Sequence, residues 1–211
     1  MKRLFLFSLI VALVLASSAA FAAMRGPSRA PLGYGNFALK VDYIDFTENE
    51  LKDLDVDTAA YIALEGYGMI APNLYLGIEV GYANPDGGVS GPVRIPPFGV
   101  LDGHIDTEVT FAPSELNLKY AINAAPNLVI DFGAGISTTY VEIEQTVTTR
   151  PVTIFVSEND WLFGGQFFVD LNYTANQFFI GINAKYHLTE DFEDFTNFNN
   201  WRIGGQVGIR F

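Results

Sequence analysis

The sequence predicts an all-β fold, an eight-stranded antiparallel up-and-down β-barrel whose strands cross a membrane. Three observations predict it. Apolar and polar residues alternate in eight segments, the connections between these segments are alternately long and short, and the chain begins with a targeting signal. Only 17% of the 211 residues are charged and 14% are aromatic. This composition supplies enough apolar surface for a folded chain and excludes a long disordered one.

The start of the chain has the three parts of a signal peptide. Lys2 and Arg3 form a positive start, the residues up to Ala16 are almost entirely apolar, and small residues follow, ending in Ala-Phe-Ala at Ala22. The alternative is a retained anchor, because the apolar run is about long enough to span a bilayer as a helix. The small residues favour cleavage, and we predict that residues 1–22 are removed on export.

The eight alternating segments are each about as long as a tilted strand that crosses a bilayer. In the first, Leu39 and Val41 alternate with Lys40 and Asp42, so one face is apolar and the other polar. The predicted apolar faces are, in chain order, Phe37, Leu39, Val41 and Tyr43; Ala60, Ile62 and Leu64; Leu74, Leu76, Ile78, Val80 and Tyr82; Leu116, Leu118, Tyr120 and Ile122; Leu128, Ile130, Phe132 and Ala134; Phe167, Val169, Leu171 and Tyr173; Phe178, Ile180, Ile182 and Tyr186; and Trp201, Ile203, Val207, Ile209 and Phe211.

Alternation alone also fits a soluble barrel such as a lipocalin, which turns its apolar face inward. Two features favour a membrane barrel. The polar faces are rich in Gly, Asn and single charges, which suit a crowded lumen better than a solvated surface. Aromatic residues recur near strand ends on the apolar faces, as in aromatic girdles. These aromatic residues are Tyr43, Tyr82, Tyr120, Tyr173, Tyr186, Trp201 and Phe211.

The connections differ in length in a regular way. Short turns are predicted at residues 71–73, 124–127 and 174–177, and long connections at 47–57, 84–105, 145–160 and 189–200. Alternation continues from Val141 to Val156, which predicts a hairpin above the membrane around Thr149-Arg150-Pro151. The connection at 84–105 contains four prolines and several apolar residues, and two alternatives remain open for it. It either folds over the barrel mouth or offers an apolar contact patch.

Eleven charged residues occupy predicted lumen-facing positions. The acids are Asp42, Glu65, Glu79, Glu115, Asp131 and Asp170, and the bases are Lys40, Lys119, Lys185, Arg202 and Arg210. Eight strands enclose a space that side chains just fill, and an unpaired charge inside it is costly. We therefore predict a salt-bridged plug and not an open pore. The alternative is that some of these groups contact luminal water.

Catalysis, metal binding and nucleic-acid binding receive little support. The chain has no cysteine, and its net charge of −12 disfavours contacts with phosphate backbones. His104 and His187 are the two histidines; the nearest approach to a nucleophile–histidine–carboxylate set is His187 with Thr189 and Glu190. We predict no catalytic residue, no metal site and no cofactor, with His187 in the polar upper lumen and His104 in a loop.

The end of the chain, Trp201-Arg-Ile-Gly-Gly-Gln-Val-Gly-Ile-Arg-Phe211, resembles the C-terminal assembly signal of bacterial outer-membrane proteins. Its signal positions are Trp201, Ile203, Val207, Ile209 and Phe211. The mature chain resembles the small eight-stranded outer-membrane barrels (the OmpA transmembrane domain, OmpX and OmpW), and its opening, Gly35 to Tyr43, is most similar to OmpW-like members. The resemblance implies a location in the outer membrane, contact with lipopolysaccharide, and handling by periplasmic chaperones and the outer-membrane assembly machinery. The implied division is a signal peptide (residues 1–22), a short periplasmic segment (23–34) and the barrel domain (35–211).

The acids outside the lumen predict a strongly negative outer end. Eighteen acids lie in or beside the long connections, with only Lys52, Arg94 and Arg150 to offset them, a net charge of −15. Such an end would repel lipopolysaccharide phosphates unless divalent cations bridge the two. Three functions remain open: a monomeric structural or surface-interaction barrel with a blocked lumen, which we predict; an OmpW-like conduit for small, mostly apolar molecules; and a lipid-modifying enzyme.

Overall fold

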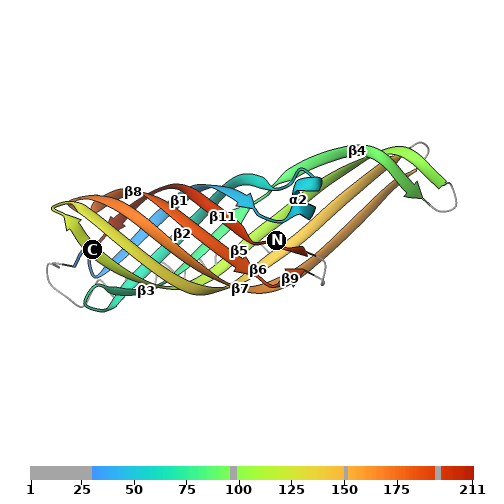
Figure 1. Ribbon diagram of the computed structural model, residues 1–211. Helices are drawn as coiled ribbons and strands as arrows, with labels where there is room; N and C mark the ends of the chain where they lie inside the picture. The colour runs from blue at the N-terminus through green and yellow to red at the C-terminus, as the bar shows by residue number, and fades with distance from the viewer. Residues whose placement is uncertain (1–29, 96–98, 150–151, 193–195) are drawn as a thin grey trace, which may run out of the picture.

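The structure is a computed structural model that describes residues 30–95, 99–149, 152–192 and 196–211. It is a barrel with a long sheet projecting from one end (Figure 1). Its elements are β1 (Gly35–Phe46), α2 (Asn49–Asp53), β2 (Thr58–Ala71), β3 (Leu74–Ala83), β4 (Asp86–Ile95), β5 (Gly99–Ala125), β6 (Leu128–Thr149), β7 (Thr153–Ala175), β8 (Phe178–Thr189), β9 (Asp191–Phe192), β10 (Thr196–Asn197) and β11 (Asn200–Arg210). The predicted signal peptide lies outside the described residues. Within them, no helix is long and apolar enough to cross a membrane.

Eight strands close into a ring by antiparallel pairing. The order is β1, β2, β3, β5, β6, β7, β8 and β11, and β11 pairs back with β1 through contacts such as Phe37↔Ile209. The β3–β5 ladder is interrupted beside Pro113, which has no N–H to donate: pairing passes from Val80↔Ser114 to Ala83↔Phe111. The predicted eight-stranded up-and-down barrel is therefore confirmed.

The ends of the barrel differ as the connection lengths predict. Tight turns join β2 to β3, β5 to β6 and β7 to β8 at what we call the turn end. Asn73 and Asn176, at the first and third of these turns, have φ angles of 65° and 54°, which asparagine tolerates better than most residues. The other connections lie at the opposite, loop end. There α2 occupies the first connection and the small β9–β10 hairpin the last.

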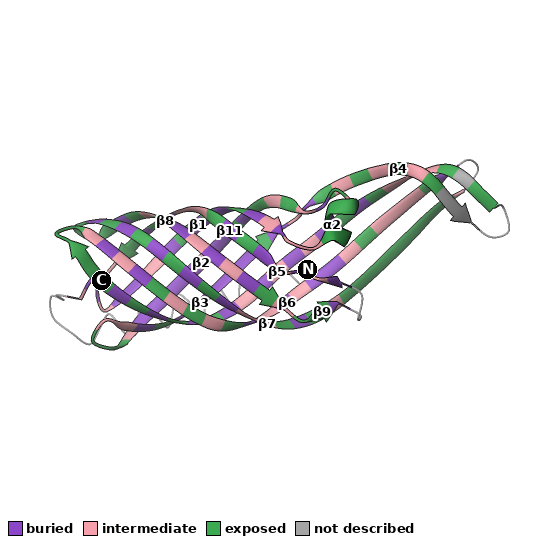
Figure 2. Ribbon diagram, in the orientation of Figure 1, coloured by how far each residue is buried: buried purple, intermediate pink, exposed green. Residues whose placement is uncertain are grey.

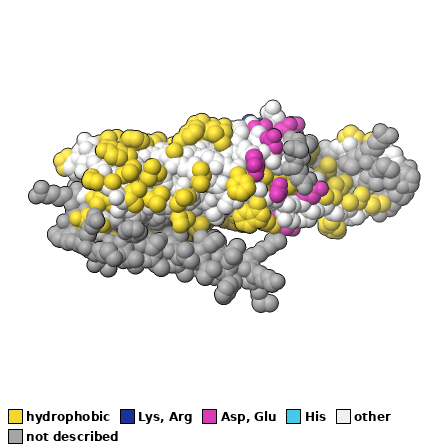
Figure 3. Space-filling model, turned by 90° about the horizontal axis from the view of Figure 1, so that it is seen from below, with side chains coloured by type: hydrophobic (Ala, Val, Ile, Leu, Met, Phe, Trp, Pro, Cys, Tyr) yellow, Lys and Arg dark blue, Asp and Glu magenta, His cyan; other side chains and the backbone are white. Residues whose placement is uncertain are grey.

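Side chains alternate between the outer wall and the lumen along each strand, which gives the banded pattern of Figure 2. On β1, Val41 and Tyr43 are 54% and 57% exposed, whereas Lys40 and Asp42 are buried. Apolar side chains spread over the outer wall in Figure 3. Trp201 packs on Tyr186 there, with ring centroids 4.5 Å apart. An outer wall of this kind suits a hydrocarbon environment.

The longest strands extend past the ring and form a sheet of their own. Beyond the barrel, β5, β6 and β7 continue to pair, and β4 adds to the edge of β5 through pairs such as Val89↔Ile105. We call this four-stranded extension the projecting sheet. The predicted hairpin at 141–156 is confirmed by the pair Thr148↔Thr153, and its tip, residues 150–151, lies outside the described residues.

Two alternatives were open for residues 84–105, and the first, that they fold over the barrel mouth, is wrong. This connection does not fold over the mouth; its described residues form β4 and the first part of β5, directed away from the barrel (Figure 1). The reason is that Val89 and Ile105 alternate with polar and glycine residues, so the segment can extend the existing β5–β6 ladder.

Replacing Ile182 by arginine should lower the free energy of unfolding from a bilayer by about 2–4 kcal/mol, the cost of a charged side chain at mid-membrane on a barrel wall. Ile182 lies near the middle of β8 and is 64% exposed. Urea-induced unfolding from phospholipid vesicles measures the change. The control is Phe155→Arg on the projecting sheet, where the residue is 77% exposed and outside the ring. Equal losses in the two variants would contradict the assignment of the outer wall to the membrane.

Candidate functional site: the lumen and the projecting sheet

An apolar cluster fills the lumen at the loop end. Phe46 and Phe111 meet edge to face with ring centroids 5.1 Å apart, and Phe198 meets Phe46 in the same way at 5.8 Å. Leu51 of α2 and Val56 of the first connection add their buried side chains to this cluster from the loop end. We call this cluster the apolar cap. It closes the mouth of the barrel with side chains from the ring and from two long connections.

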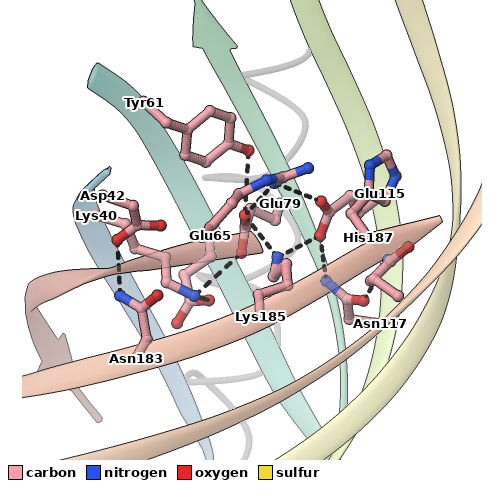
Figure 4. A network of polar contacts seen from close by, with 12 residues as sticks. Lys40, Asp42, Tyr61, Glu65, Glu79, Glu115, Asn117, Asn183, Lys185 and His187 are labelled. Carbon is pink, nitrogen blue, oxygen red and sulfur yellow. Dashed lines mark hydrogen bonds and ion pairs between the residues drawn. The ribbon is translucent and has the colours of Figure 1, made fainter. Parts of the chain in front are cut away.

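A network of buried ions lies between the apolar cap and the turn end of the barrel. Figure 4 shows this network. Glu79 is at its centre: its Oε2 lies 3.2 Å from Lys40 Nζ, and its Oε1 lies 2.7 Å from Lys185 Nζ. Lys40 Nζ also lies 3.2 Å from Glu65 Oε2. Lys185 contacts Glu115 as well, and Arg202 Nη1 lies 2.9 Å from Glu115 Oε1. All these side chains are at most 2% exposed, so each charge is neutralised by its neighbours and not by solvent.

Aromatic rings and amides complete the coordination of these ions. The Arg202 guanidinium lies 4.3 Å from the Tyr61 ring centroid, and Lys119 Nζ lies 3.8 Å from that of Tyr67, both within cation–π range. Asn117 Nδ2 donates to Glu115 Oε2 at 3.1 Å. Side chains from six strands thus hold the network in place.

The turn end is closed by a second apolar cluster, to which the N-terminal segment contributes. Leu32 is fully buried there beside Tyr67, Tyr75 and Phe168. Its N–H donates to Tyr75 Oη at 3.3 Å, and the Tyr75 hydroxyl donates to the Gly33 carbonyl at 2.9 Å. The described part of the segment predicted to be periplasmic, residues 30–34, therefore packs against the turn end.

The structure places ten of the eleven predicted luminal charges in the lumen, and Arg210 elsewhere. Arg210 lies at the rim of the turn end, where its guanidinium donates to the carbonyls of Asn176 and Pro31. Of the predicted charges, the lumen consequently holds six acids and four bases. Two of these acids, Asp131 and Asp170, stand directly opposite each other on β6 and β7 and are fully buried.

The predicted C-terminal signal residues lie at the seam where the ring closes. Trp201, Ile203, Val207 and Ile209 are between 43% and 61% exposed on the outer wall. The Phe211 carbonyl accepts hydrogen bonds from the N–H groups of Tyr34 and Gly35.

The sequence analysis did not predict a serine–histidine contact in the lumen, because the two residues are 50 positions apart. Ser137 Oγ lies 2.7 Å from Nε2 of the fully buried His187, and Asn200 Nδ2 lies 3.4 Å from His187 Nδ1. Arg202 Nε donates to Asn200 Oδ1, which fixes the Asn200 amide as a donor toward the histidine. His187 Nδ1 is then an acceptor and Nε2 carries the proton, so this arrangement makes Ser137 an acceptor and leaves it without a general base.

The outer face of the projecting sheet carries six acids, which we call the acidic face: Asp86, Asp102, Asp106, Glu108, Glu142 and Glu144. Five of them are exposed, whereas Glu142 is 8% exposed and accepts a hydrogen bond from the Tyr140 hydroxyl. Asp86, Glu108 and Glu144 follow one another in a single cross-strand row. His104 is a partly exposed neighbour whose Nε2 lies 2.9 Å from Asp106 Oδ1. Within the described ranges, no group of three or more histidines and acids has a geometry that could hold a metal ion.

The sequence matches the model of a known protein family, "Outer membrane protein beta-barrel domain", over residues 7–193. The chain belongs to this family. It is accordingly a small bacterial outer-membrane barrel of eight strands, and in this class the long loops are extracellular. The comparison with curated proteins found no match.

Solved structures of outer-membrane proteins are similar to this chain. OprG from Pseudomonas aeruginosa aligns with a TM-score of 0.51 and 14% identity over 86% of this chain and 99% of OprG. Ail, the attachment invasion locus protein of Yersinia pestis, gives 0.48 and 14% over 83% and 98%. Neisserial surface protein A gives 0.48 and 9% over 84% and 96%. At 14% identity the similarity to OprG concerns the fold alone.

Glu79→Gln should lower the free energy of unfolding by about 3–5 kcal/mol, because removing one partner from a buried ion network leaves the others uncompensated. Lys40, Lys185 and Arg202 each lose one of their carboxylate partners. Unfolding from vesicles by urea measures the change. Glu144→Gln is the matched control: Glu144 is exposed on the acidic face opposite Glu108, so its neutralisation relieves a repulsion and should not lower stability. A loss at Glu79 no larger than that of the control would show that the network is not needed for stability.

Proposed function

We propose that this protein is a non-enzymatic, monomeric barrel of the cell outer membrane that interacts with lipopolysaccharide through its acidic face, with divalent cations between the two. The observation that carries the proposal is the row Asp86–Glu108–Glu144, three carboxylates directly opposite one another on adjacent strands. Like charges in such positions destabilise a sheet. These carboxylates do not form a metal site by themselves, so the cation would be shared with a lipopolysaccharide phosphate, where its charge would relieve the repulsion.

The position of the acidic face suits this partner. Alternate residues of a strand share a face, so Glu142 and Glu144 continue the side of β6 that carries Ile136, which is 66% exposed on the outer wall. The acidic face thus rises directly from the lipid-facing wall. A phosphate-bearing lipid packed around the barrel would meet these acids just above its acyl chains.

The packed lumen supports a structural role over transport. The apolar cap, the ion network and the cluster at the turn end follow one another along the barrel axis. An ion crossing the lumen would have to break contacts in all three layers. The donor role of His187 toward Ser137 likewise supports a function without hydrolysis.

The two ends of the chain carry the proposed signals for export and assembly. We propose that residues 1–22 are cleaved on export and that periplasmic chaperones deliver the chain to the outer-membrane assembly machinery. Trp201 to Phe211 would be the recognised segment. It forms β11, the strand that must pair with β1 to close the ring.

Removal of Mg²⁺ and Ca²⁺ should weaken the association of the refolded protein with lipopolysaccharide, because the phosphates and the acidic face then repel each other directly. The triple variant Asp86→Asn, Glu108→Gln, Glu144→Gln should lose most of this cation dependence. Co-flotation with lipopolysaccharide-containing vesicles, with and without a chelator, measures the association.

The control carries the same charge change at the loop end but off the acidic face: Asp45→Asn, Glu48→Gln, Asp57→Asn. It should keep the cation dependence of the parent protein. An association that the chelator does not alter, or an equal effect of the two triple variants, would refute the cation bridge.

A narrow conduit for small apolar molecules is the second candidate, and the apolar cap favours it, because the outer end of the lumen is lined by apolar side chains such as Ile44 and Phe46. Planar-bilayer conductance of the refolded mature chain separates the two functions. We expect silence or rare brief openings, since the ion network blocks the lumen. Reproducible openings that Glu79→Gln or Arg202→Met enlarges would make transport the function.

A further inference from the structure

A groove of about 590 Å³ lies at the loop end, on the inner side of the projecting sheet. Its walls come from three parts of the chain: α2 with the residue after it, β6 with β7, and the β9–β10 hairpin. This volume is within the range of about 300–1,000 Å³ typical of small-molecule sites. The groove is separate from the acidic face, which lies on the other side of the same sheet.

The floor of the groove is apolar. Leu51 and Phe192 are 2% and 3% exposed and form its base, where they belong to the apolar cap. Ile143 and Leu54 are half-buried, and Val156 is 42% exposed. Because Ile143 and Val156 lie on the lumen-facing side of their strands, they extend the apolar surface of the cap outward. An apolar group placed here would be shielded from water on several sides.

The rim of the groove is negative. Glu50 and Asp53 of α2 stand on one side and Glu158 of β7 on the other, and all three are exposed. The lining contains no Lys or Arg among the described residues. Lys52, the basic residue of α2, instead donates to the Thr47 carbonyl at 3.3 Å. The groove therefore combines an apolar floor with carboxylates on opposite sides of its opening.

We propose that this groove binds small amphipathic ammonium compounds, molecules with one apolar group of a few carbons and one positive head. The apolar group would lie over Leu54, Ile143 and Val156, and the ammonium group would lie between Glu158 and the acids of α2. Burial of the apolar group supplies affinity, and the carboxylates select the cation over a neutral or anionic analogue of the same length. This proposal is independent of the interaction with lipopolysaccharide.

The test uses the full mature protein in phosphatidylcholine nanodiscs at about 0.15 M salt, where long-range surface charge is screened. Hexylammonium is titrated by isothermal calorimetry, and 1-hexanesulfonate is the anionic analogue with the same chain. Empty nanodiscs correct for partition into lipid. We expect saturable binding of hexylammonium with a stoichiometry of one and no saturable binding of the sulfonate.

Two variants test the rim and the floor separately. Glu50→Gln with Glu158→Gln should weaken hexylammonium binding about fivefold, as expected for the loss of two exposed ion pairs. Val156→Ser should weaken it about threefold through the loss of apolar contact. The matched control, Glu108→Gln with Glu144→Gln, removes the same charge from the acidic face and should change the affinity less than about twofold. None of these residues belongs to a luminal contact of the ring, and a heat-dependent gel shift verifies that each variant forms the barrel.

Three outcomes would overturn the proposal: equal binding of hexylammonium and hexanesulfonate, absence of saturable binding, or equal weakening by the two double variants. The last outcome would show that the cation responds to the general negative field of the loop end. Failure of this test leaves the lipopolysaccharide experiment unaffected, because that experiment depends on the opposite face.

Discussion

Hydrocarbon offers no hydrogen-bond partner to a peptide group, and the whole structure depends on this constraint. Every N–H and C=O inside the membrane must pair within the protein, which for strands requires a closed ring. β11 therefore has to meet β1, the first and last strands must be in register, and the turns on one side must be tight. Closure with eight strands in turn fixes a narrow interior. The polar residues that alternate with lipid-facing ones must therefore pack against one another inside the ring.

Period-two alternation allowed the ring to be predicted from the sequence because it reports an environment that changes at every residue. Val41 and Asp42 are neighbours in sequence, yet one faces lipid and the other the lumen. Long-range pairing is less accessible. Glu115 and Arg202 are 87 residues apart, and no local pattern indicates that their side chains meet. Composition indicates that luminal charges must pair, and only the register of the ring determines which ones do.

The departures from expectation have physical reasons of the same kind. Arg210 continues the alternation of β11, but it forms the last pair of the β1–β11 ladder, at the rim, where backbone carbonyls are available to it. Residues 86–95 resembled a loop because glycine and proline disfavour strands. They form β4 because an existing edge on β5 was available for pairing. The Ser137–His187 contact arises from the curvature of the ring, which places β6 and β8 within reach across β7.

The lengths of the strands also determine which part of the molecule is encountered first from outside. At about 3.3 Å per residue, the twelve or so residues of β5 beyond its pairing with β3 extend roughly 40 Å along the strand. The barrel itself sits within the membrane, whereas the far ends of β5, β6 and β7 are joined to it by a continuous hydrogen-bonded ladder. A phage, an antibody or a neighbouring cell would therefore touch the far part of the projecting sheet before any residue of the ring. Because the projecting sheet lies outside the ring, its exposed residues can change in sequence without any change in the wall that keeps the protein in the membrane.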